Sequence, residues 1–180
     1  MAKPGFQSQK NAEHGFTLVE MLVYTAVSVI LMTAVSVFVV WALNLQNASK
    51  ALRETLEHAQ RAMDQTVLEV RAAKSIYTPT TNSTQLSLET TKYLPPQETT
   101  TSIDFFICEN RLCLKKESQN PVALTSDNIE ITSITFQEVT TASPTSSVQI
   151  TLQAQYKNPT NRPELKAQVT LTSTASLRSY

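Results

Sequence analysis

The stretch His14-Gly15-Phe16-Thr17-Leu18-Val19-Glu20 opens an apolar run that continues to Leu45. Glu20 is the only charged residue between Phe16 and Leu45. An ionised carboxylate at membrane depth is costly unless it is paired, and for that reason intramembrane ionisable residues are functional candidates. The sequence therefore predicts a helix that can enter a membrane and that carries Glu20 for a specific purpose.

A short polar segment precedes the apolar run. It spans Met1 to Gly15 and carries Lys3 and Lys10, which predicts a cytoplasmic N-terminus because basic residues favour that side of the membrane. An ordinary secretory signal has its small-residue cleavage site after the apolar core, whereas the Gly15-Phe16 junction lies before it. We therefore expect the apolar segment to remain in the processed protein.

This arrangement resembles the type IV prepilins and the pseudopilins of type II secretion, with Gly15, Phe16 and Glu20 at the matching positions. The resemblance implies that residues 1–15 form a leader, that a prepilin peptidase cuts after Gly15, and that the new N-terminal Phe16 is methylated. It also implies that the Phe16 amine of one filament subunit pairs with the Glu20 carboxylate of its neighbour, so that each charge satisfies the other in a low dielectric. The simpler alternative is that Glu20 is protonated in lipid, which leaves its placement unexplained.

A second helical pattern follows the apolar run. From Gln46 to about Tyr77, apolar residues recur three and four positions apart, as in an amphipathic helix. No Pro or Gly interrupts the chain from Phe16 to Thr78, so residues 16–45 and 46–77 are predicted to form one helix. We expect the first half to be a transmembrane or filament-core segment and the second half to pack on the rest of the domain. The expected packing stripe consists of Leu52, Leu56, Ala59, Met63, Val67, Val70 and Ala73, and the polar remainder includes Arg53, Glu54, Glu57, Arg61, Asp64 and Glu69.

In residues 78–180 the apolar period changes to two, which is typical of half-buried strands. Alternation predicts strands over 148–156 and 165–171, and a short strand is expected over 86–88. A further strand, 129–139, changes phase at Ser133, which predicts a β-bulge there. The amphipathic helix is the only long surface available to cover these strands. The predicted fold is therefore α+β, a long N-terminal helix packed on a C-terminal antiparallel sheet, as in type IV pilin-like proteins.

Two cysteines, Cys108 and Cys113, flank the segment Glu109-Asn110-Arg111-Leu112 between alternating apolar residues. This spacing predicts a hairpin with the two sulfurs across its neck, and a disulfide suits an exported domain. Two free buried thiols, a zinc site and a catalytic thiol are the alternatives. A zinc site lacks ligands, because His14 would leave with the leader and only His58 remains.

The chain has two glycines, Gly5 and Gly15, and both lie in the predicted leader. Turns that need a positive φ must therefore use other residues, of which Asn and Asp are the most tolerant. The asparagines in loop-like stretches are the candidates: Asn82, Asn110, Asn120, Asn128, Asn158 and Asn161.

Composition gives little support for nucleic-acid binding or catalysis. The chain has 15 basic and 15 acidic residues, and its longest basic run is Lys115-Lys116, so no direct nucleic-acid binding is expected. His58 lies on the charged flank of the helical pattern, where a solvated side chain is the ordinary case. The sequence also lacks the glycines of a nucleophile elbow. We predict no catalytic residue, no metal site and no cofactor.

These features favour a structural subunit of a type IV pilus or a type II secretion pseudopilus. The segment 124–129, Phe136 and the terminal Ser176-Leu177-Arg178 are similar to minor pseudopilin J and minor pilin W-like proteins, which implies a minor subunit. The implied partners are the prepilin peptidase, other pilin or pseudopilin subunits, the inner-membrane assembly platform and, before assembly, membrane lipid. The implied location is a single-pass membrane protein with a cytoplasmic N-terminus, and then an extracytoplasmic filament. The alternatives are a permanently membrane-anchored binding or adhesion module and a membrane-tethered enzyme.

Overall fold

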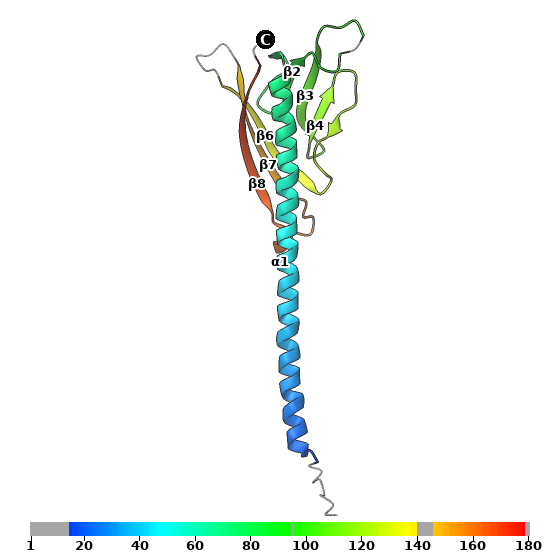
Figure 1. Ribbon diagram of the computed structural model, residues 1–180, viewed down its shortest axis with the longest axis vertical. Coiled ribbons are helices and arrows are strands. Elements are labelled where there is room, and N and C mark those ends of the chain that lie inside the picture. The colour runs from blue at the N-terminus through cyan, green and yellow to red at the C-terminus, as the bar shows by residue number, and fades with distance from the viewer. Residues whose placement is uncertain (1–14, 95, 140–145, 179–180) are drawn as a thin grey trace, which may run out of the picture. The chain divides into compact units, whose positions relative to one another are not determined.

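The structure is a computed structural model that describes residues 15–94, 96–139 and 146–178. These residues form one long helix, a short 3₁₀ helix and eight strands (Figure 1). The chain divides into two compact units, residues 1–43 and 44–180, and α1 has residues in both. The elements are α1 (Leu18–Ala72), β1 (Ser75–Ile76), β2 (Leu86–Thr90), β3 (Thr101–Cys108), β4 (Arg111–Lys116), β5 (Val122–Ala123), β6 (Ile129–Val139), β7 (Ser147–Tyr156), η1 (Pro163–Leu165) and β8 (Gln168–Ser176).

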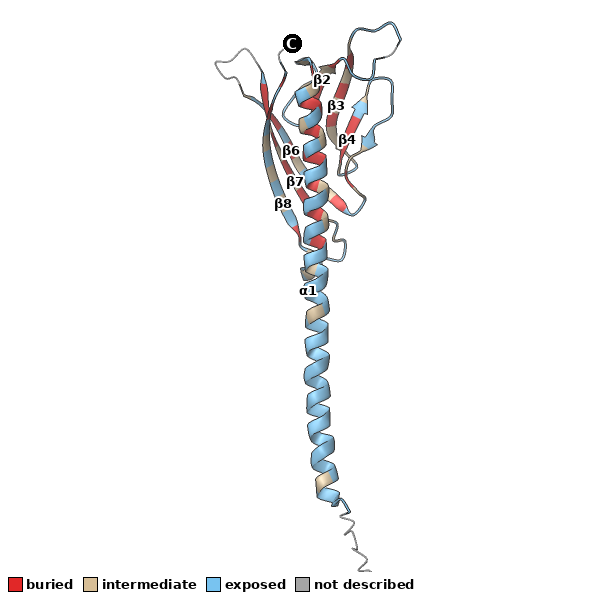
Figure 2. Ribbon diagram, viewed as in Figure 1, coloured by how far each residue is buried: buried red, intermediate tan, exposed pale blue. Residues whose placement is uncertain are grey.

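The first unit contains the apolar part of α1. This part of the helix is exposed along nearly its whole length (Figure 2). Its exposed large apolar residues include Phe38 and Trp41, whose ring centroids lie 6.1 Å apart. A helix that is apolar on every side requires lipid or other protein around it. Among the described residues, α1 is the one helix that is long and apolar enough to cross a membrane.

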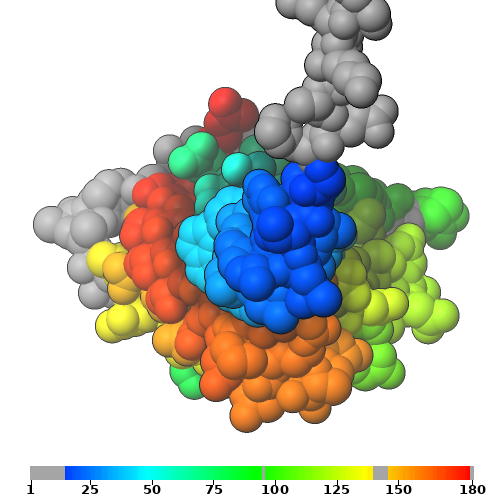
Figure 3. Space-filling model, turned by 90° about the horizontal axis from the view of Figure 1, so that it is seen from below, coloured from blue at the N-terminus to red at the C-terminus, as the bar shows by residue number. Residues whose placement is uncertain are grey.

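The second unit contains two antiparallel sheets, whereas the sequence pattern predicts one. The five-stranded sheet has the order β1-β2-β3-β4-β5, and the three-stranded sheet has the order β6-β7-β8. Seen along α1, β8 lies on one side of the helix and the β3–β4 hairpin lies on the other (Figure 3). Both sheets share one hydrophobic core with α1, which includes Ala59, Leu86, Phe105, Ile134 and Leu152. The predicted α+β fold is confirmed, with two sheets in place of one.

Most of the predicted packing stripe of α1 is confirmed, because Ala59, Met63, Val70 and Ala73 are buried and Val67 packs against the core. The prediction is wrong for Leu52 and Leu56, whose exposed fractions are 49% and 37%. The smaller side chains of Ala51 and Thr55 are buried in this part of the helix instead. The hydroxyls of Thr55 and Thr66 donate to backbone carbonyls one turn earlier at 2.8 Å, so they are buried without unpaired polar groups. The buried helix residues are Ala51, Thr55, Ala59, Ala62, Met63, Thr66, Glu69 and Val70.

The helix ends at Ala72, before the predicted end at Tyr77. The chain leaves the helix because it pairs with a strand: Ser75 and Ile76 form β1 beside β2, and the Lys74 N–H donates to the Glu89 carbonyl at 2.8 Å. The Ser75 hydroxyl also donates to the Glu89 carboxylate at 2.6 Å. Hydrogen bonds from Ser75 and Thr100 lower the pKa of Glu89, so it remains an ionised acceptor.

The predicted strands are present with shifted ends. The bulge at Ser133 is confirmed, because Ile131 pairs with Ala154 and Ser133 pairs with Gln153, which leaves Thr132 unpaired. The strand predicted over 165–171 begins later, at Gln168, because Leu165 belongs to η1. Pro163 explains this shift, since its fixed φ suits the first turn of a helix and it has no N–H for a sheet.

The prediction that asparagine supplies the positive-φ turns is wrong for most of these residues. Among the described residues, Asn110 and Asn161 have positive φ, and so do Tyr93, Gln97, Glu109 and Ser118. Other asparagines shape loops with their side chains instead. The Asn82 amide oxygen accepts the N–H groups of Thr84 and Gln85, both at 2.9 Å, which is an Asx-type turn.

The packing face of α1 gives the first prediction. Ala59→Leu is expected to lower the free energy of unfolding by about 1–3 kcal/mol, because Ala59 is fully buried and added methylenes overpack its surroundings. The control, Leu52→Ala, removes an exposed side chain and is expected to change it by less than about 0.5 kcal/mol. Urea unfolding of the full chain in detergent, followed by circular dichroism, measures both. A larger loss for Leu52→Ala than for Ala59→Leu would contradict the packing face.

Candidate processing and assembly site

The start of α1 is set by a capping residue that sequence reasoning missed. Thr17 precedes the first helical residue, Leu18, and its hydroxyl accepts the Glu20 N–H at 3.2 Å. The Thr17 carbonyl accepts the Met21 N–H, also at 3.2 Å. Thr followed three residues later by Glu is the sequence pattern of a capping box, so the signal was present in the motif itself. Thr17 and Glu20 thus have a local role in starting the helix.

Glu20 lies half-buried in the first turn of α1. The Tyr24 hydroxyl, one turn further on, donates to its Oε1 at 3.3 Å. The Tyr24 ring in turn meets the Phe16 ring edge to face, with centroids 6.3 Å apart. A carboxylate is favoured at this end of a helix because it faces the positive end of the helix dipole. The ion pairs found among the described residues do not include Glu20.

Gly15 and Phe16 lie exposed just before the helix, and Phe16 has an exposed fraction of 70%. A Cβ atom added at Gly15 would meet nothing within 4 Å. The chain therefore has no steric need of its own for glycine at this position.

The predicted cysteine hairpin is present, and Cys108 and Cys113 form a disulfide. The alternatives of two free thiols, a zinc site or a catalytic thiol are therefore wrong. The two Cα atoms lie 5.9 Å apart across the end of the β3–β4 ladder. Glu109 and Asn110 make the two-residue turn with φ of 49° and 59°, which is the type I′ geometry that matches strand twist.

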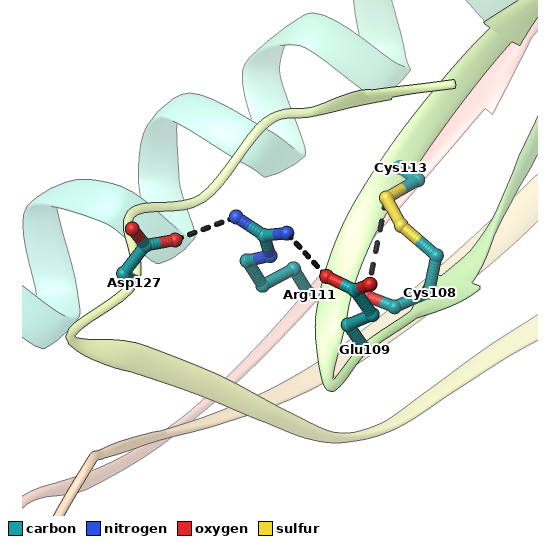
Figure 4. Close-up of polar contacts among 5 residues, drawn as sticks. All are labelled: Cys108, Glu109, Arg111, Cys113 and Asp127. Carbon is teal, nitrogen blue, oxygen red and sulfur yellow. Dashed lines mark hydrogen bonds and ion pairs between the residues drawn. A yellow bond between two sulfur atoms is a disulfide. The ribbon is translucent and has the colours of Figure 1, made fainter. Parts of the chain in front are cut away.

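Arg111, which sequence reasoning did not single out, holds the hairpin tip (Figure 4). Its guanidinium donates to Glu109 at 2.7 Å and to Asp127 at 2.5 Å, and Asp127 lies in the loop before β6. Both carboxylates are largely exposed, so each ion pair adds little stability. The tip also joins the two sheets, because the Asn110 carbonyl accepts the Ile131 N–H at 2.7 Å.

A buried carboxylate on α1 corrects the predicted polar face. Glu69, expected at the surface, is 3% exposed. It accepts the Tyr93 hydroxyl at 3.2 Å and lies 3.6 Å from the Lys92 ammonium, which ties α1 to the loop after β2. Burial, followed by the charge of Glu69, raises the pKa of Tyr93, so its hydroxyl remains a donor at neutral pH. The Lys116 ammonium lies over the Tyr93 ring, 3.6 Å from its centroid.

The described residues hold no group of three His, Cys, Asp or Glu side chains that is placed to bind a metal ion. The start of α1 thus offers an exposed backbone at Gly15 and a half-buried carboxylate at Glu20, and the second unit contains a disulfide.

Comparison with known families also points to the start of α1. Residues 10–36 match a family model described as the prokaryotic N-terminal methylation motif, which is the leader of type IV prepilins and pseudopilins. The match covers Gly15, Phe16, Glu20 and the beginning of α1. Neither the comparison with curated proteins nor that with solved structures gives a match. The chain thus carries a type IV prepilin leader, and its apolar helix fits a single-pass membrane anchor.

The disulfide gives the second prediction. The double variant Cys108→Ala/Cys113→Ala is expected to lose about 2 kcal/mol of unfolding free energy, because the bond closes a short loop and its entropic effect is modest. Urea unfolding measures the loss. A reducing agent should produce the same loss in the wild type and none in the double variant. Alkylation of both thiols in native, unreduced protein would contradict the bond.

Proposed function

We propose that the chain is a minor structural subunit of a type IV pilus or a type II secretion pseudopilus, assembled into a helical filament after its leader is removed. The observation that carries this proposal is the methylation motif at residues 10–36, placed at the start of a helix that is exposed and apolar on all sides. In the second unit the helix and the two sheets share one hydrophobic core. We assign no catalysis to it.

Processing is expected at the Gly15-Phe16 bond by a prepilin peptidase, with methylation of the new N-terminus. Gly15 is exposed and lies outside α1, so a peptidase can reach its backbone without unfolding the helix. Cleavage would create an ammonium group at Phe16, one residue before the Thr17 cap. A positive charge at the positive end of a helix dipole is unfavourable, so this amine requires a negative partner.

Glu20 is the expected partner, supplied by the neighbouring subunit in the filament. Within its own chain Glu20 accepts the hydroxyl of Tyr24, a neutral donor, and the ion pairs found among the described residues do not include it. An ion pair between subunits would compensate both charges in the apolar filament core. The same interaction would fix the axial position of each incoming subunit relative to the last one added. We expect the assembly platform of the inner membrane to take part in this step.

The third prediction concerns the leader. Gly15→Leu is expected to leave unprocessed precursor in the membrane, because a side chain would block close approach of the peptidase, whereas the fold should be unaffected. Gly5→Leu, at the other glycine of the leader, is the matched control and should be trimmed normally. Intact-mass spectrometry should find a wild-type chain that starts at methylated Phe16. Normal trimming of Gly15→Leu would reject this cleavage site.

The fourth prediction concerns Glu20. Glu20→Gln keeps an acceptor for Tyr24 but removes the charge, and an unpaired charge in an apolar core costs about 3–5 kcal/mol. We expect this variant and Glu20→Ala to be inserted and trimmed but largely lost from filaments. Tyr24→Phe, the control, removes the hydroxyl alone and should be incorporated.

Quantitative immunoblots of sheared filaments and of membranes measure this distribution. Wild-type levels of Glu20→Gln in the filament fraction would reject the pairing role. A trimmed wild-type chain that stays in the membrane, with no filament fraction, would favour the alternative of a permanently anchored binding or adhesion module.

A further inference from the structure

The outer edge of β8 is the longest strand edge left open among the described residues. The two sheets have four edge strands, β1, β5, β6 and β8, of which β1 and β5 have two residues each. β6 contains a bulge, and its outer edge is already partly bonded. The Ile131 N–H donates to the Asn110 carbonyl at 2.7 Å, and the Phe136 N–H donates to the Ser83 carbonyl at 2.9 Å. β8 has nine residues, and its pairing with β7 has no register shift.

The sequence of β8 also lacks the features that normally protect an edge. Proteins block open edges with Lys or other charges, Pro, bulges or very short strands, because a regular edge pairs with any extended chain. The strand Gln168–Ser176 contains no charged residue and no Pro, and the same is true of its neighbour β7. An edge this long and this uncharged is suited to pairing with another strand.

The backbone groups that face outward can be identified from the bonds at the two ends of β8. The Tyr156 N–H donates to the Ala167 carbonyl, and the Leu177 N–H donates to the Ser146 carbonyl. Odd-numbered residues of this segment therefore bond to β7, and alternation points the N–H and C=O of even-numbered residues to the open edge. The even-numbered residues are Gln168, Thr170, Thr172, Thr174 and Ser176, all of which are exposed.

The side chains of β8 define the chemistry of a partner strand. On the outer face of the sheet, which is the face away from the core, hydroxyl pairs already link β7 and β8. Ser147 bonds to Ser176 at 2.8 Å, and Thr151 bonds to Thr172 at 3.3 Å. On the inner face, Val169 and Leu171 are only partly covered. A strand with uncharged polar residues on one face and apolar residues on the other would continue both faces and cover these two side chains.

We propose that β8 accepts such an uncharged, alternating strand from a different subunit of the filament, as a fourth strand of its sheet. The identity of the donor rests on the proposed function, whereas the open edge does not. Main-chain hydrogen bonds to Thr170, Thr172 and Thr174 would supply affinity, and the alternating faces would supply specificity.

A second copy of this chain is a poor donor for geometric reasons. β8 and the second half of α1 run in the same direction (Figure 1). Antiparallel pairing of two β8 strands would therefore point the two helices in opposite directions, which copies anchored through the same end do not allow. Parallel pairing of two β8 strands would need a two-fold axis along the strands. This rotation turns the second sheet over, so the apolar face of one sheet would continue into the hydroxyl face of the other. The other edge strands of a second copy are no better suited, because β1 and β5 have two residues each and the outer edge of β6 already bonds to Asn110 and Ser83. The donor we propose is therefore a different subunit.

The first test uses the full chain in detergent and a synthetic peptide that copies residues 147–156, because β8 already pairs with that sequence in β7. Saturating peptide is expected to slow amide hydrogen exchange at Thr170, Thr172 and Thr174 by about tenfold or more. Thr172→Pro removes one outward N–H and Thr172→Lys places a charge at the edge, and both should abolish this protection. Thr172→Val keeps the N–H and should retain it.

Slow exchange at Leu171 and Ser173, which bond to β7, would show that each variant remains folded. Unchanged exchange at the even-numbered amides of the wild type, or equal protection in Thr172→Lys, would overturn the proposal. An untrimmed leader would reject the filament role without changing this result, because the peptide assay uses the isolated chain.

The second test identifies the donor in cells, with the photo-crosslinking residue p-benzoylphenylalanine in place of Thr172. The expected adduct, identified by mass spectrometry, is a different protein that also carries a prepilin leader. An adduct with a second copy of this chain, or with a protein that lacks such a leader, would overturn the assignment of the donor. So would the absence of an adduct in filaments that contain the trimmed chain.

Discussion

The hydrophobic core that α1 shares with the two sheets is the interaction on which the rest of the second unit depends. Alanine and threonine are among the helix residues buried there, and the Thr55 and Thr66 hydroxyls bond to the helix backbone, so they need no partner in the strands. One core therefore serves both sheets. Glu69 strengthens this arrangement, because Tyr93 and Lys92 hold the loop after β2 against the helix.

The disulfide lies beside a second connection between the two sheets, the tip of the β3–β4 hairpin. Cys108 and Cys113 close the β3–β4 hairpin next to a turn whose two residues both have positive φ without being glycine. Such turns are costly for ordinary residues, so the surrounding structure must hold them in place. The turn presents the Asn110 carbonyl to the Ile131 N–H of the other sheet, and Arg111 links the same tip to Asp127. A covalent bond at this position thus protects a contact between sheets as well as one hairpin.

Sequence patterns predicted the features that depend on neighbours in the chain and missed those that depend on packing. The long helix, the disulfide hairpin and the bulge at Ser133 follow from local periodicity and spacing. The beginning of the packing face of α1 did not, because hydrophobicity favours Leu52 and Leu56, whereas the residues buried there are Ala51 and Thr55. Burial of Glu69 was equally hidden, since its partners lie more than 20 residues away in sequence. The Thr17 cap was readable from its spacing to Glu20 and was overlooked.

Three features of this chain lack a partner among the described residues: the apolar surface of residues 18–43, the charge of the Glu20 carboxylate and the open edge of β8. The kind of partner that each one requires supports a filament over a permanent membrane anchor. Lipid can cover the apolar surface of residues 18–43, because hydrocarbon requires no specific contact. Lipid offers no cation to Glu20 within the hydrocarbon, and it offers no hydrogen bonds to the open edge of β8. Water can solvate that edge, but an uncharged edge then remains open to unwanted pairing. Another protein can satisfy all three features, through packing of apolar helices, an ion pair at Glu20 and an added strand at β8.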